Sequence, residues 1–187
     1  MSIFFPEIQE YLCNRNQLIE LCTDSTEDNF DVGYINIFNK SILCLDLLDR
    51  FGQEDGVGVF TTDSIDKICI DTKYLQGIAH LARNQTPKNL VNFMFDSNDK
   101  MSDILKKCVE KKIIIRIWMD NYDYSYSGIV SKVTDNLFSI YEVDEYGKTS
   151  GLTILETGHI GAIYMFDNKL TKLSAIGKLE QESYPES

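Results

Sequence analysis

Few residues of this chain have the types and spacing that chemistry needs. Its two histidines, His80 and His159, stand far apart in the sequence. A metal site or a catalytic triad places imidazole beside other ligands or a nucleophile, and two isolated rings supply little of this. No phosphate-binding loop, dinucleotide-binding glycine motif or nucleophile elbow occurs. We therefore expect a protein that is not an enzyme and uses no cofactor or metal.

The cysteines indicate a reducing compartment. Their number is odd, they are widely spaced, and each sits among apolar residues, where a free thiol behaves as a small hydrophobe. They are Cys13, Cys22, Cys44, Cys69 and Cys108. The N-terminus lacks the basic and apolar regions of a signal peptide, and no apolar run approaches the roughly 20 residues that span a bilayer. These features predict a cytoplasmic protein with free, buried thiols.

Acidic residues dominate the charge. The 187 residues contain 29 Asp and Glu against 18 Lys and Arg, a net charge of −11. Such a surface repels phosphate backbones and anionic membranes, which disfavours nonspecific binding to either. The densest acidic run, Asp24–Asp31, lacks the glycine and the terminal glutamate of an EF-hand loop. We interpret this run as a solvated hairpin loop.

The chain is an internal repeat with an offset of 95 residues. Residues 33–81 lie over residues 128–176 without a gap, and glycines and apolar positions coincide. The identical pairs are Gly33/Gly128, Asp49/Asp144, Gly52/Gly147, Gly56/Gly151, Thr62/Thr157, Ile65/Ile160, Ile68/Ile163 and Leu75/Leu170. The three prolines fall outside both copies. We therefore predict a first barrel repeat over residues 1–82, a connector over 83–100, a second repeat over 101–176 and a flexible tail over 177–187.

Each repeat predicts a short helix followed by five short antiparallel strands. The helices are expected near Pro6–Arg15 and Ser102–Lys112, and a closing helical turn carries Leu75 in one repeat and Leu170 in the other. The strands are expected at Leu18–Thr23, Phe30–Phe38, Ile42–Asp49, Val57–Thr62 and Lys67–Ile70, and at Ile113–Met119, Tyr122–Val133, Leu137–Asp144, Leu152–Thr157 and Ala162–Phe166. Hairpin turns at Asp49–Gly56 and Asp144–Gly151 place Gly52, Gly56, Gly147 and Gly151 where positive φ is needed. This order suggests a mainly β protein of two small, strongly bent barrels.

The order of elements resembles the Sm-like (Lsm) family of SH3-like barrels. In that family a strand glycine is followed by apolar residues two, five and nine positions on. The matching residues are Gly33, Ile35, Phe38 and Ile42 in the first repeat and Gly128, Val130, Val133 and Leu137 in the second. The resemblance implies tandem Sm-like barrels. The family's RNA pocket is not matched, because Asn39, Leu43, Thr134 and Phe138 stand at its positions, and the expected Arg-Gly before the last strand is missing.

Two surface features predict a binding role. Tyr122, Tyr124 and Tyr126 alternate, so in a strand they share one face. The offset places Glu27, Asn29 and Asp31 at the matching positions, an exchange that a core does not tolerate. The charge is also uneven, because residues 7–82 carry a net −9 and residues 101–176 a net −1. We expect partner-binding residues at Glu27, Asp28, Asp31, Tyr122, Tyr124 and Tyr126, unless the tyrosines cover the repeat–repeat interface.

The function that these observations favour is that of a non-enzymatic, acidic protein-binding module. Its expected partner is a protein with a basic surface, as for an inhibitor or an immunity-type protein that caps a toxin. The alternative is an Sm-like RNA-binding regulator that works through residues other than the family pocket. The sequence predicts no membrane partner and is compatible with an oligomer.

Overall fold

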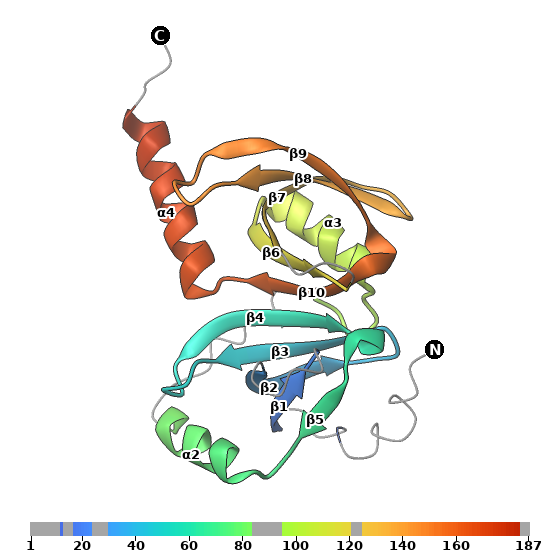
Figure 1. The fold of residues 1–187 in the computed structure, drawn as a ribbon, viewed down its shortest axis with the longest axis vertical. Helices are drawn as coiled ribbons and strands as arrows, with labels where there is room; N and C mark the ends of the chain where they lie inside the picture. The colour runs from blue at the N-terminus through green and yellow to red at the C-terminus, as the bar shows by residue number, and fades with distance from the viewer. Residues whose placement is uncertain (1–11, 13–16, 24–29, 84–94, 121–124, 184–187) are drawn as a thin grey trace. The chain divides into compact units, whose positions relative to one another are not determined.

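The computed structural model describes residue 12 and residues 17–23, 30–83, 95–120 and 125–183. The chain divides into two compact units, Met1–Met101 and Ser102–Ser187. Both are built mainly from antiparallel strands, which confirms the predicted mainly β class (Figure 1). Among the described residues, no helix has the length and apolar character that a membrane span requires.

Unit 1 forms a five-stranded antiparallel sheet. Its strands are β1 (Leu18–Cys22), β2 (Asp31–Phe38), β3 (Ile42–Leu48), β4 (Glu54–Thr61) and β5 (Lys67–Cys69). Their order in the sheet is β5-β1-β2-β3-β4, so the last strand lies beside the first. A short 3-10 helix, η1 (Thr62–Ser64), separates β4 from β5.

Helix α2 (Lys73–Ala82) closes unit 1. Thr72 caps it, because its side-chain oxygen accepts a hydrogen bond from the backbone N–H of Leu75 at 3.1 Å. Leu75 and Ile78 are spaced for one helix face, and both are buried with Val32 of β2. The apolar side chains on one face of α2 thus pack the helix against the sheet.

Unit 2 repeats the same order of strands. Its strands are β6 (Ile114–Met119), β7 (Ser125–Val133), β8 (Leu137–Val143), β9 (Thr149–Glu156) and β10 (Ile160–Met165), with η3 (Thr157–His159) between the last two. Their order in the sheet is β10-β6-β7-β8-β9. Helix α3 (Met101–Lys111) precedes these strands and α4 (Asn168–Ser183) follows them. When the strands are matched by the 95-residue offset, the two units have one topology.

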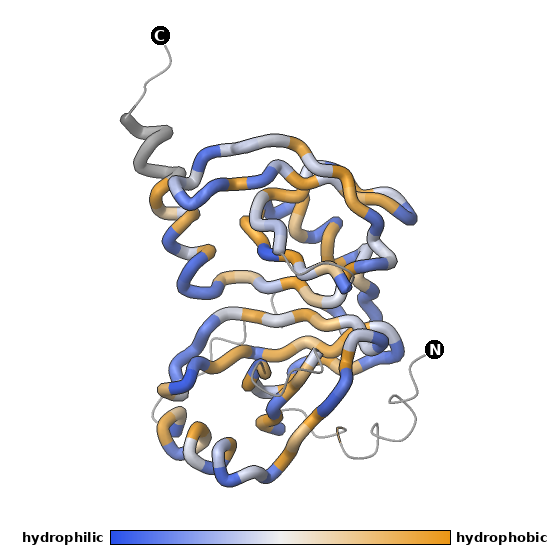
Figure 2. Tube along the Cα trace, viewed as in Figure 1, coloured by the Kyte–Doolittle hydropathy of each residue, from blue (hydrophilic) through white to orange (hydrophobic). Residues whose placement is uncertain are grey.

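Helix α3 supplies part of the core of unit 2. The strands of the unit curve around it (Figure 1). Ile104, Leu105 and Cys108 recur at three- and four-residue spacing and are fully buried. The Cys108 thiol lies 3.7 Å from the sulfur of Met165 on β10. Hydrophobic residues are concentrated in these buried segments and in the central strands of unit 1 (Figure 2).

The two units also share details of backbone geometry. Asp49 Oδ1 accepts hydrogen bonds from the N–H groups two and four residues on, and Asp144 Oδ1 does the same. These hydrogen bonds stabilise the hairpin turn in each unit. The glycine of the turn has a positive φ in both cases, +73° at Gly52 and +76° at Gly147. These are the positive φ values that the sequence predicts for Gly52 and Gly147.

Several predicted elements differ from the structure. Helix α4 continues to Ser183, so it includes part of the segment 177–187, whose flexibility stays a prediction. The helix expected at Pro6–Arg15 lies outside the described residues, apart from buried Leu12. In unit 1, β4 pairs with β3 and β5 pairs with β1. Among the strand pairs of the described residues, none joins the two edge strands of a unit, which is the pair that would close it into a barrel. The mainly β class is therefore established, and the tandem barrels remain a prediction.

Candidate protein-binding surface

Strands β8 and β9 present one side-chain face away from the core of unit 2. Their register pairs Leu137 with Glu156, Ser139 with Ile154, and Tyr141 with Leu152. Directly paired residues share a face of an antiparallel sheet, and so do residues two positions apart. We name the apolar members of this set, which are Leu137, Tyr141, Leu152 and Ile154, the β8–β9 face.

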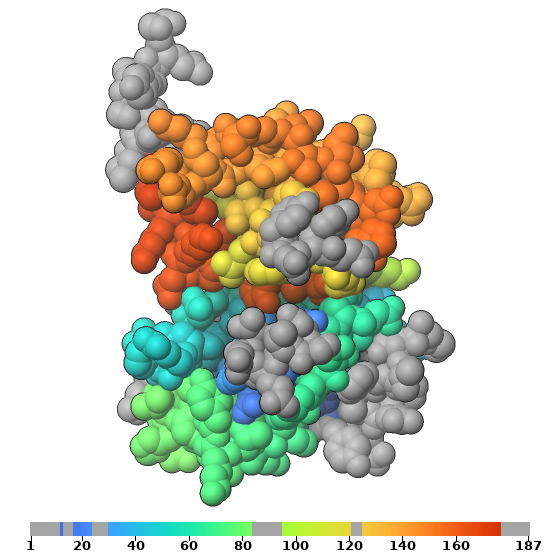
Figure 3. Space-filling model, in the orientation of Figure 1, coloured from blue at the N-terminus to red at the C-terminus, as the bar shows by residue number. Residues whose placement is uncertain are grey.

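The β8–β9 face is exposed, whereas two residues on the opposite face of β8 are buried. Ile154 is 66% exposed, Leu152 51% and Tyr141 46%. On the opposite face, Phe138 and Ile140 are 1% and 0% exposed. The space-filling view shows the atoms of β8 and β9, in orange, forming the outer surface of unit 2 (Figure 3). Four large apolar side chains on adjacent strands, open to solvent, form a contiguous patch of the kind that marks binding sites.

The matching residues of unit 1 are buried. The offset places Ile42 at Leu137, Val57 at Leu152 and Val59 at Ile154, and all three unit 1 residues are 0% exposed. Asn39 Nδ2 donates hydrogen bonds to the backbone oxygens of Ser97 and Asp99, which holds these two residues beside β3. The same apolar positions are therefore core in one unit and surface in the other.

Most of the predicted partner-binding residues lie outside the described residues. These are Glu27, Asp28, Tyr122 and Tyr124. Asp31 begins β2 and pairs with Leu21, while Tyr126 lies in β7 and pairs with Ile117. Both described side chains are half-buried, and they belong to different units. Their contribution to binding remains a prediction.

The other two predicted turn glycines, Gly56 and Gly151, differ in backbone conformation. Gly56 has φ of +85° at the start of β4, which is a backbone conformation that favours glycine. Gly151 lies within β9, is exposed and has no positive φ, so no turn geometry requires glycine there.

The described cysteines are free, and the buried ones are poor nucleophiles. Burial raises the pKa of the Cys108 thiol from 9.0 to about 12. Burial, with the charges of Asp99 and Asp46, raises the pKa of Cys44 further. Burial also raises the pKa of Cys22, although Lys67 opposes the shift. Because the thiolate is the reactive form, these residues fit the structural role expected of them. Cys13 lies outside the described residues.

The histidines do not belong to a metal cluster. His159 Nε2 lies 3.0 Å from Glu156 Oε2, and both side chains are substantially exposed. Within the described ranges, no group of three or more His, Cys, Asp or Glu residues is arranged to hold a metal ion.

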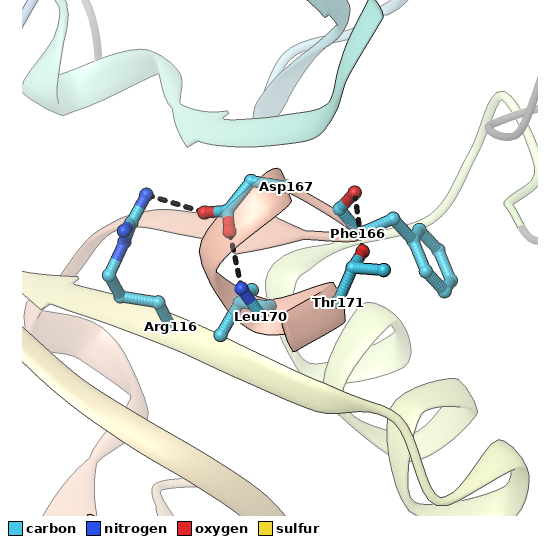
Figure 4. A network of polar contacts seen from close by, with 5 residues as sticks. All are labelled: Arg116, Phe166, Asp167, Leu170 and Thr171. Carbon is cyan, nitrogen blue, oxygen red and sulfur yellow. Dashed lines mark hydrogen bonds and ion pairs between the residues drawn. The ribbon is translucent and has the colours of Figure 1, made fainter. Parts of the chain in front are cut away.

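A buried ion pair joins β6 to the start of α4. The guanidinium of Arg116 lies 2.7 Å from Asp167 Oδ2, and Asp167 Oδ1 accepts a hydrogen bond from the N–H of Leu170 (Figure 4). Asp167 thus caps α4 and neutralises Arg116 at once. Phe166, with φ of +60°, precedes this cap, as Asp71, with φ of +56°, precedes the Thr72 cap of α2. The network positions a helix and leaves Asp167 only 5% exposed.

The sequence did not identify the β8–β9 face. Alternating apolar residues in β9 indicate a strand with one side facing the core. Nothing else in the sequence around Leu152 and Ile154 indicates that these side chains are exposed. The comparison with Val57 and Val59 of unit 1 would have favoured burial in both units. No protein family, curated protein or solved structure matches the chain.

Proposed function

We propose that the protein is a non-enzymatic protein-binding module that contacts its partner through the β8–β9 face. The observation that carries the proposal is the exposure of Leu137, Leu152 and Ile154 where the matching unit 1 residues, Ile42, Val57 and Val59, are fully buried. Tyr141 is exposed on the same face. Aliphatic and aromatic side chains of this size lose unfavourable water contact when a partner covers them.

Tyr141 is the best candidate for an anchor residue on this face. It is paired with Leu152 and has a neighbouring strand on each side, so its ring is supported before a partner binds. Tyrosine provides a large contact area with little loss of side-chain freedom. Truncation of a true anchor costs about 2 kcal/mol of binding free energy.

The fold proposed for each unit is a small Sm-like or SH3-like barrel. The pairing of the last strand with the first, in the order β5-β1-β2-β3-β4, supports this arrangement. The matched order β10-β6-β7-β8-β9 supports it for unit 2.

The expected partner is a cytoplasmic protein with a basic surface. A net charge of −11 accelerates the approach of such a partner and repels acidic competitors. An inhibitor or an immunity-type protein that caps a basic toxin has this combination of an acidic surface and an apolar contact.

The test is cross-linking capture with face variants of the full chain. Tyr141→Ala and Leu152→Ser should each reduce capture of a partner that the wild type captures, with unchanged thermal unfolding. The matched control is Ile176→Ser, which alters an apolar residue of α4 that is 38% exposed. Equal capture by all four proteins would contradict the proposal. Binding of a short RNA with a steep salt dependence would favour the Sm-like RNA-binding alternative instead.

A further inference from the structure

Strand β9 is an edge strand of its sheet. Among the strands of the described residues it is last in the order of unit 2, and β8 is its single neighbour there. Its eight residues, Thr149–Glu156, are exposed or half-exposed along the whole length. An edge strand has one row of backbone N–H and C=O groups without partners from the sheet, which makes it a template for another strand.

Strand β9 lacks several of the features that usually protect such an edge, although its pairing with β8 has one register shift between Glu142 and Val143. Residues 149–155 include no charged residue and no proline. The edge strand β5 of unit 1, by comparison, is three residues long and begins with Lys67. Short length and a lysine are common protections of sheet edges, and β9 has neither. These two edge strands, one from each unit, are therefore protected differently.

The charges around β9 indicate the chemistry of a partner strand. Residues 142–156 contain four acids and one base, and Glu156 at the end of the strand is exposed. Between these charges, Leu152 and Ile154 present apolar surface at alternate positions. A complementary strand carries apolar residues at alternate positions and basic residues at its ends.

We propose that β9 binds an extended segment of the partner as an added strand, with alternating apolar residues against Leu152 and Ile154 and basic residues at the ends. This inference rests on the proposed protein-binding function and specifies how the partner is held. Backbone hydrogen bonds to the edge supply affinity, and the apolar pair with its acidic surroundings supplies selectivity.

The experiment uses the isotopically labelled full chain and a synthetic peptide in which valine and threonine alternate between flanking pairs of lysines. Peptide addition should shift the β9 amide resonances and slow their hydrogen exchange. The control peptide has the same side chains with alternate backbone nitrogens methylated, which removes donors from the added strand. We expect it to bind at least about tenfold more weakly, a difference of about 1.4 kcal/mol.

Protein variants distinguish strand addition from nonspecific binding of the peptide. Ile154→Lys introduces a charge that opposes the basic peptide and should weaken binding at least about tenfold, while Ile176→Lys on α4 should leave binding unchanged. Equal binding of the methylated and unmethylated peptides would overturn strand addition. Protection of the β9 amides by self-association, without peptide, would overturn it in favour of a second copy as the occupant.

The proposed function can survive the failure of this inference. If Tyr141→Ala and Leu152→Ser abolish partner capture while the peptide neither binds nor protects β9, the β8–β9 face binds side chains and the edge binds nothing. If both capture and peptide binding are independent of these residues, the two proposals fail together.

Discussion

Gly128 of β7 faces the backbone carbonyl of Tyr141 on β8 so closely that a β-carbon would lie 2.0 Å from the oxygen. Gly33 has the same relationship to Asp46 in unit 1, at 2.6 Å. No β-carbon fits at the first distance, so the strands must move apart if one is added. This close approach explains physically why glycine occupies the second strand of both units.

We therefore expect Gly128→Ala to destabilise the protein by about 2–3 kcal/mol, the usual cost of forced overpacking. Gly151→Ala is the control, because a β-carbon there meets no atom within 4 Å. Chemical denaturation measures both. Equal midpoints for the two variants would contradict the close approach of β7 to β8.

The hairpin glycines give a second prediction. Gly52→Ala and Gly147→Ala each place a β-carbon on a residue with positive φ, which costs about 1 kcal/mol. Gly52→Ala should cost more, because its β-carbon would also lie 2.9 Å from the backbone nitrogen of Ala82. Thermal unfolding should rank wild type above Gly147→Ala and Gly147→Ala above Gly52→Ala. Equal unfolding temperatures for the two variants would show that backbone strain alone decides the loss, and the reverse order would contradict the close contact at Gly52.

Such turns were predictable because their signal is local. The spacing from Asp49 to Gly52, repeated from Asp144 to Gly147, determines a side-chain hydrogen bond and a positive φ within four residues. The β8–β9 face was not predictable, since Val57 and Leu152 are both apolar strand residues at equivalent positions. What differs is the burial of each side chain in the folded protein, where Val57 is 0% exposed and Leu152 is 51% exposed. That information is absent from any local pattern.

The ion pair between Arg116 and Asp167 gives a third prediction. Asp167→Asn preserves an oxygen that can cap α4 but leaves the largely buried guanidinium without its counter-charge, so we expect a loss of about 3 kcal/mol. Asp103→Asn is the matched control, because its pair with Lys106 spans 3.5 Å between exposed side chains. That substitution should cost less than about 0.5 kcal/mol. Similar losses in denaturation would mean that the Arg116 pair is worth no more than a surface pair.

Alkaline pH provides a fourth prediction through Cys108. The unfolded thiol ionises near its ordinary pKa of 9.0, whereas burial raises the pKa in the folded protein to about 12. The folded state therefore binds more protons above pH 9, and stability must fall as pH rises through this window. Cys108→Ala removes this contribution, so its free energy of unfolding should decline less steeply than that of the wild type between about pH 9 and 11. Parallel declines would show that Cys108 ionises alike in both states.

The last prediction separates the predicted acidic and tyrosine residues by kinetics. If the acids near Asp31 attract a basic partner, charge reversal of Glu27, Asp28 and Asp31 should slow association, because steering acts over roughly 8 Å at physiological salt. If the tyrosines are packed contacts, alanine at Tyr122, Tyr124 and Tyr126 should instead speed dissociation, with about 2 kcal/mol lost at a true anchor. Surface plasmon resonance with the captured partner measures both rates, with Ile176→Ser as the control. Unaltered kinetics in two folded triple variants would leave the β8–β9 face as the proposed binding surface. Unfolding of the tyrosine variant would instead assign those rings to the core or to the repeat–repeat interface.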